Sequence, residues 1–209
     1  MGVKYYSSAE IEQLEEFYRR RLINSLTGYK NPFLVGTISK TKNENLAIFS
    51  SVFHLGANPA LLGMVCRPHT VRRDTLENIL ETKKYTLNLV EETFYKEAHQ
   101  TSARYKADES EFAATGLNPE YKENFLAPYV AESSVQIGMT FLESLQINYN
   151  QTQIIIGKVE SLFINESLLA ADGHIAFENS NAVCVSDLDT YYSPKRISRL
   201  SYAKPNKKL

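Results

Sequence analysis

A short basic segment ahead of a predicted helix carries the residues best suited to bind an anion. The segment reads CRPHTVRRDTLENI from Cys66 to Ile79. It places three arginines and the first helical turn together: Arg67, Arg72, Arg73, Asp74 and Thr75. The first turn of a helix has unpaired backbone N–H groups and a partial positive charge, and guanidinium groups add bidentate donors. This combination predicts a site for a phosphate monoester. By spacing alone, a solvated charge pair with an additional helix cap remains an equal alternative.

The segment NLAIFSSVF, which precedes this site in the chain, offers small polar groups. A strand period of two puts Ser50 on one side, unless a bulge intervenes, and the following residues on the other: Asn45, Ala47, Phe49 and Ser51. Hydroxyl groups and accessible backbone suit the edge of a planar heterocycle. A barrel bulge, or serines that simply face solvent, also explains the pair, and the residues alone favour this simpler interpretation.

Motifs for other chemistry are absent from the sequence. It has no Gly-x-Ser-x-Gly elbow, Walker loop, GxGxxG or HExxH motif. The four histidines share no metal-ligand spacing. Cys66 and Cys184 stand far apart in apolar runs without a CxxC pattern. We therefore expect no bound metal, no catalytic acid, base or nucleophile, and two reduced thiols.

Composition limits the classes of function. The 209 residues, 43% of them hydrophobic, suffice for one good core, so we expect a single domain over residues 1–209. Lys and Arg number 23 against 24 Asp and Glu, which argues against attraction of the whole molecule to nucleic acid or to an anionic membrane. The sequence shows neither an apolar run of bilayer length nor an apolar signal-peptide core, so we expect a cytoplasmic protein.

The elements that must position these residues are mainly strands. Short runs rich in β-branched and aromatic residues predict them: FLVGTIS, NLAIFSSVF, ALLGMVC, YTLNLV, VQIGMTFLESLQI and TQIIIGKVESLFI. Polar links between the first three favour an antiparallel meander. The predicted class is therefore mainly β with flanking helices.

Three helical segments accompany the strands. A capping box of Ser7 and Glu10, followed by apolar residues at helical spacing, predicts an amphipathic helix over 8–22. Asp74 should open a second, short helix, with Glu77 at the capping-box position. A polar and aromatic stretch over about 93–124 is typical of a helical excursion that lies across the strands.

The run from Gly36 to Val90 resembles, in order and over its whole length, the core of the flavin reductase-like, FMN-binding split-barrel family. The similar pieces are a Gly-Thr strand, Asn-x-Ala-x-x-Ser-Ser, an Asn-Pro-Ala-Leu turn, an Arg-Asp-Thr-x-x-Asn-Ile helix start and a strand with a central Asn. The tail DLDTYYSPKRISRLSYAKP is similar to the closing segment of that family.

The resemblance implies a split β-barrel that holds FMN non-covalently, a homodimer, and hydride transfer from NAD(P)H to the flavin. It implies that the flavin phosphate lies at Arg67, Arg72, Arg73, Asp74 and Thr75. It also implies that the flavin ring and ribityl chain lie along Asn45, Ala47, Phe49, Ser50 and Ser51. Tyr192, Arg199 and Tyr202 of the tail are expected to reach the partner's site. The chemistry is that of the cofactors, which the protein binds and aligns.

One position departs from the family pattern. Many reductases of the family have a His shortly before the strand written here as IIIGKV, and this chain has Gln153 there. Use of a nicotinamide is thus implied less directly than binding of FMN. The alternatives are a non-enzymatic FMN protein for electron transfer or sensing, and a module that has lost the cofactor. A monooxygenase that takes up reduced flavin is the implied protein partner.

Overall fold

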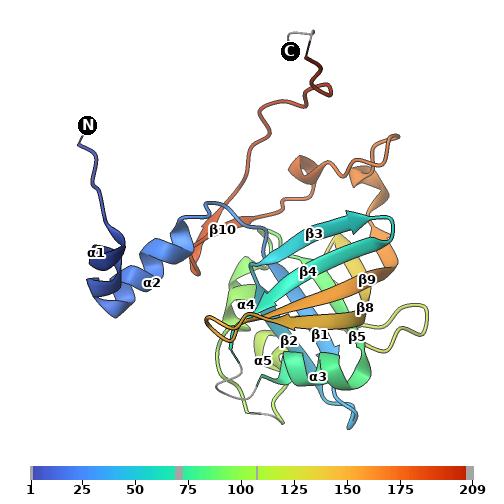
Figure 1. The fold of residues 1–209 in the computed structure, drawn as a ribbon. Coiled ribbons are helices and arrows are strands. Elements are labelled where there is room, and N and C mark those ends of the chain that lie inside the picture. The colour runs from blue at the N-terminus through green and yellow to red at the C-terminus, as the bar shows by residue number, and fades with distance from the viewer. Residues whose placement is uncertain (1, 69–72, 107, 206–209) are drawn as a thin grey trace.

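The computed structural model describes residues 2–68, 73–106 and 108–205. Its centre is a seven-stranded antiparallel sheet with the strand order β2-β1-β5-β8-β9-β4-β3 (Figure 1). The strands are β1 (Phe33–Ile38), β2 (Glu44–Phe49), β3 (Val52–Ala57), β4 (Ala60–Cys66), β5 (Lys84–Leu89), β8 (Val135–Gln146) and β9 (Gln153–Ile164). The prediction of a mainly β class with flanking helices is confirmed.

The two ends of this strand order are neighbours in the chain. β2 ends at Phe49 and β3 begins at Val52, so only Ser50 and Ser51 join one edge of the sheet to the other. The prediction of one continuous strand over 45–53 is therefore wrong. The prediction that the first three strands form a meander is wrong as well, because β2 and β3 do not pair. The chain turns at the serines, where Val65 N–H donates to Ser51 O at 3.0 Å, and β3 continues as the partner of β4 rather than of β1.

α3 (Asp74–Thr82) begins at Asp74, as the sequence predicts, and packs against β1 and β2. Its N-cap is Arg73, however, so the prediction that Glu77 stands at the capping-box position is wrong. Its Leu76 and Ile79 are buried in the main core together with side chains from β1, β4, β5, β8 and β9. This packing fixes the first turn of α3 beside the β2 edge.

The segment over 93–124 contains α4 (Tyr95–Gln100), α5 (Glu111–Thr115) and β6 (Pro119–Glu120), which pairs with β7 (Tyr129–Val130). Both helices contact β2. They enclose a second core in which Phe94, Ala98 and Phe112 pack with Leu34 of β1 and Leu46 of β2. β2 is thus in contact with α3 as well as with α4 and α5.

The predicted continuous helix over 8–22 is instead two helices, α1 (Ser8–Gln13) and α2 (Glu16–Ser25). The capping box of Ser7 and Glu10 is confirmed. The break occurs because the Glu15 carboxylate accepts hydrogen bonds from Phe17 N–H and Tyr18 N–H and so starts a new helix. Neither helix contains a buried residue, so the apolar periodicity did not mark a core-facing stripe.

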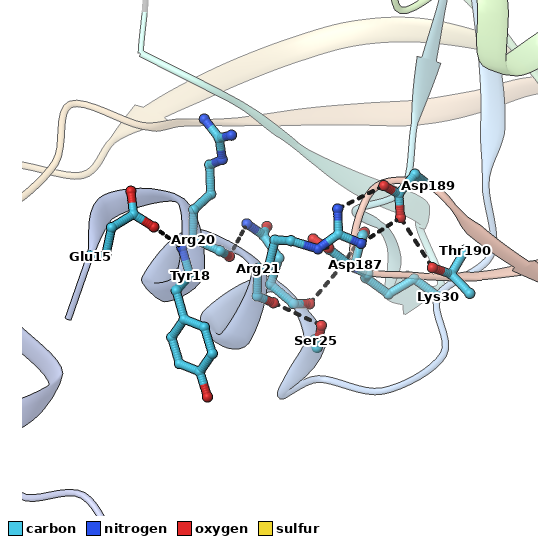
Figure 2. Close-up of polar contacts among 10 residues, drawn as sticks. Glu15, Tyr18, Arg20, Arg21, Ser25, Lys30, Asp187, Asp189 and Thr190 are labelled. Carbon is cyan, nitrogen blue, oxygen red and sulfur yellow. Dashed lines mark hydrogen bonds and ion pairs between the residues drawn. The ribbon is translucent and has the colours of Figure 1, made fainter.

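The last elements are two 3₁₀ turns, Glu166–Leu168 and Phe177–Asn179, and the hairpin of β10 (Cys184–Ser186) with β11 (Thr190–Tyr192). Figure 2 shows Arg21 reaching from α2 to the turn of this hairpin. Its guanidinium makes two hydrogen bonds to the Asp189 carboxylate, at 2.8 and 3.0 Å, and an ion pair with Asp187 at 3.2 Å. Across the described parts of the chain, no helix has the length and apolar character needed to cross a membrane.

Candidate functional site

A cavity of about 920 Å³ lies beside the β2 edge. Its volume is within the range of small-molecule and cofactor sites. One wall contains nine of the residues predicted from the sequence: Asn45, Ala47, Phe49, Ser50, Ser51, Arg67, Arg73, Asp74 and Thr75. The structure therefore brings the β2 strand, the end of β4 and the first turn of α3 to one place. Arg72 lies outside the described residues.

The start of α3 presents hydrogen-bond donors to this cavity. Arg73 stands at the N-cap position, and its side chain makes no cap hydrogen bond to the first turn. Instead, its Nε donates to Pro68 O at 3.1 Å, which holds the guanidinium at the start of α3. Together with the helix N-terminus and the Thr75 hydroxyl, this arrangement suits a phosphate group.

Asn45 connects the strand to the helix. Its Nδ2 donates to Thr75 Oγ1 at 3.0 Å and to Thr37 Oγ1 of β1 at 3.1 Å. Asn45 and Thr75 are both buried. The polar groups on this wall are consequently held by the protein itself before any ligand binds.

The opposite wall comes from elements in which the sequence shows no motif. It is formed by α4, the segment after it, α5, the β10–β11 hairpin and the end of α2, and its residues include Asn24, Lys30, His99, Thr101, Ser102, Ala103, Arg104, Tyr105, Glu111, Leu188, Asp189 and Tyr191. His99 Nδ1 lies 3.0 Å from Tyr191 Oη, within hydrogen-bond distance. Burial raises the pKa of Tyr191 to about 12, so its hydroxyl stays protonated at neutral pH.

Glu111 joins this second wall to the first. Its Oε2 accepts a hydrogen bond from Leu46 N–H of β2 at 2.9 Å. Burial raises the pKa of the Glu111 carboxyl, against the opposing effect of that hydrogen bond. The contact fixes α5 to the unpaired side of the β2 edge.

A second cavity, of about 470 Å³, adjoins the first and shares Asn24, Lys30, Ser50 and Ser51 with it. Lys30 Nζ donates to Asn24 O and Asp187 O, each at 3.2 Å, which ties the end of α2 to the hairpin. The space available to a ligand thus continues past the two serines.

The tail and Gln153 lie apart from the main cavity. Arg199 does not line it and pairs with Asp172. Tyr192 packs edge-on against Tyr29, with ring centroids 4.7 Å apart, and Tyr202 is 89% exposed. In Figure 1 the C-terminal segment runs away from the barrel. Gln153 is the ladder partner of Cys66 and is absent from the lining.

No group of metal-ligating side chains occurs within the residues that the structure describes. Both cysteines are free, as expected, although only Cys66 is buried and Cys184 is half-buried. Burial raises the pKa of Cys66 to about 11, so it is a thiol rather than a thiolate at neutral pH.

Comparison with known proteins shows which family shares this architecture. Residues 28–182 match the flavin reductase like domain. A protein assigned as a flavin reductase with split barrel domain, from Shewanella frigidimarina NCIMB 400, is 43% identical, with 96% of this chain and 100% of that chain covered and a TM-score of 0.93. Nitrilotriacetate monooxygenase component B from Bacillus cereus is 19% identical, with 96% and 100% covered and a TM-score of 0.84. An FMN-binding protein from Thermus thermophilus is 15% identical, with 96% and 100% covered and a TM-score of 0.72.

The last two similarities concern the fold, and the first extends to the sequence over nearly the whole chain. They confirm the split barrel that the resemblance implies, in which the sheet is open between β2 and β3. The chain belongs to the flavin reductase-like domain family.

Proposed function

We propose that this chain binds FMN non-covalently in the main cavity and transfers hydride from NAD(P)H to that flavin. The observation that carries the proposal is the wall on which Arg73, Thr75 and the start of α3 meet the polar edge of β2 in one cavity. Guanidinium groups beside a helix N-terminus, as in Arg67 and Arg73 at the start of α3, form a suitable binding site for a phosphate monoester. The FMN-binding relative from Thermus thermophilus, which has the same fold, adds support.

Each residue has a separate role in this proposal. Arg67, Arg72, Arg73, Thr75 and the first N–H groups of α3 hold the phosphate, and Asp74 takes part through the backbone of that first turn. Asn45, Ala47, Phe49, Ser50 and Ser51 lie along the ribityl chain and the ring. Bound FMN supplies the chemistry, which is acceptance of a hydride from the nicotinamide. The protein binds the two reactants, aligns them and keeps water out of the cavity, and it contributes no catalytic acid, base or nucleophile.

The runner-up function is FMN binding for electron transfer or sensing without a nicotinamide. Gln153 favours it, because the position that carries a His in many relatives is here a neutral side chain outside the cavity lining. The two functions differ in one measurable property, the rate at which NADH or NADPH reduces the bound flavin.

We further propose one domain over residues 1–209 and a homodimer in which Tyr192, Arg199 and Tyr202 approach the partner's cavity. The resemblance to the family supports the dimer. The match to a monooxygenase component B supports delivery of reduced flavin to a monooxygenase. Two free cysteines are consistent with the reducing cytoplasm.

The test is the visible spectrum of the purified full-length protein. The protein is reconstituted with FMN, freed of excess by gel filtration and mixed anaerobically with NADH or NADPH. Retained flavin that bleaches rapidly supports the reductase. Retained flavin that stays oxidised refutes hydride transfer and favours the runner-up, and loss of all flavin on the column refutes tight FMN binding. Sedimentation of the same sample tests the dimer.

A further inference from the structure

A buried hydroxyl of β1 connects the three elements that form the phosphate wall. Thr37 is 0% exposed, and its Oγ1 accepts hydrogen bonds from Asn45 Nδ2 and from Asn78 Nδ2, both at 3.1 Å. Asn78 belongs to α3 and is itself buried. One oxygen therefore joins β1, β2 and α3. Neither Thr37 nor Asn78 lines the cavity.

The arrangement determines how the wall presents its donors. The two hydrogens of Asn45 Nδ2 are both used, one by Thr37 Oγ1 and the other by Thr75 Oγ1. Because the Thr75 oxygen accepts this bond, its own proton points away from Asn45. A hydroxyl held in this way is a pre-oriented donor, and a pre-oriented donor does not have to be ordered when the ligand binds.

We propose that Thr37 and Asn78 are positioning residues for the phosphate end of the flavin site, acting through Asn45 and Thr75. This inference rests on the proposed function, since it assumes that FMN is the ligand. Thr37→Val would keep the side-chain shape and leave one buried N–H of Asn45 and one of Asn78 without an acceptor. Buried donors do not stay unpaired at low cost, so Asn45 would turn and release Thr75.

The experiment compares FMN with riboflavin, which lacks the phosphate, in fluorescence titrations of the full-length protein. For Thr37→Val we expect the Kd of FMN to rise about tenfold, as for loss of one hydrogen bond to a charged group, and the Kd of riboflavin to change less than about twofold. Thr37→Ser keeps the oxygen and should restore the FMN affinity. A general packing defect would weaken both ligands alike.

Thr86→Val is the matched control. Thr86 is also 0% exposed and also makes two hydrogen bonds, to Pro128 O at 2.6 Å and from Asn88 Nδ2 at 2.9 Å, but neither of these partners lines the cavity, whereas Asn45 does. Thr86→Val should lower the Tm and leave the ratio of the Kd values of FMN and riboflavin unchanged.

The outcomes separate the inference from the function beneath it. If the wild type binds FMN and the ratio of Kd values is unchanged in Thr37→Val, the positioning role is refuted and the proposed function stands. If the wild type binds neither flavin, both are refuted. Should Thr37→Val not fold, Thr37→Ala removes the same oxygen, and an unchanged ratio in that variant refutes the role equally.

Discussion

Replacing Arg73 with alanine should weaken FMN binding and leave riboflavin binding almost intact. Arg73 is partly buried, lines the cavity beside the first turn of α3, and is held by its Nε–H bond to Pro68 O. This contact orients the guanidinium, whose planar N–H groups have the fork geometry that binds phosphate oxygens.

The magnitude follows from the type of contact. A hydrogen bond to a charged group contributes on the order of 1.5–3 kcal/mol, and each 1.4 kcal/mol changes the affinity about tenfold. Arg73→Ala should therefore raise the Kd of FMN by about tenfold to a hundredfold, and solvent screening at a partly exposed site favours the lower end. The loss should shrink as the salt concentration rises, because screening already weakens the contact in the wild type.

Arg104→Ala supplies the comparison, because Arg104 lines the same cavity from the opposite wall. Both variants are titrated with FMN and with riboflavin at low and high salt, and their folding is compared by circular dichroism. We expect a loss specific to FMN in Arg73→Ala and a smaller loss in Arg104→Ala. The reverse order would place the phosphate on the wall of α4 and refute the assignment to α3.

Three further predictions concern the strand, the second wall and α2. Ser51→Phe should fill the cavity beside β2 and abolish retained flavin colour without changing the far-ultraviolet spectrum; persistent colour would show that Ser51 lies away from the ring. Glu111→Gln keeps an acceptor for Leu46 N–H. Burial holds the Glu111 pKa above its ordinary value of 4.5, so the folded state binds this proton more tightly than the unfolded state does. The free energy of unfolding of the wild type therefore falls as the pH rises from 4.5 through the folded-state pKa. The variant should therefore have a higher Tm than the wild type at neutral pH, with a difference that vanishes toward pH 4.5, and a constant difference would contradict the reasoning. Arg21→Met should speed hydrogen exchange in α2, most at low salt, and exchange equal to the wild type would show that the contacts to Asp187 and Asp189 do not hold the helix.

Local signals in the sequence predicted where helices and strands begin better than they predicted how these elements pack and pair. The capping box at Ser7 and the start of α3 at Asp74 depend on neighbouring residues, and both appear where expected. The break at Leu14 was missed because a stripe of apolar residues has the same spacing whether or not a core receives it. The turn at Ser50 and Ser51 was missed because strand propensity continues through it, and only the pairing of β3 with β4 reveals it.

The site divides in the same way. Nine predicted residues fall on one wall because they lie in two continuous motifs, which a resemblance can carry over. His99, Arg104, Glu111 and Tyr191 meet on the other wall through the packing of α4, α5 and the hairpin, and no spacing in the chain relates them. Thr37 was missed for another reason, since its role depends on two amides that reach it from different elements.

The two-residue connection between β2 and β3 also bears on the behaviour of the protein at high concentration. Open sheet edges are templates for strand addition from other molecules, and long flat edges promote aggregation. Here each edge strand has six residues, the β2 edge has its Leu46 N–H occupied by Glu111, and β3 carries a register shift between His54 and Gly56. A strand from another molecule would therefore find only a short edge at β2 and a short, irregular edge at β3, so the open sheet is protected against aggregation through its edges.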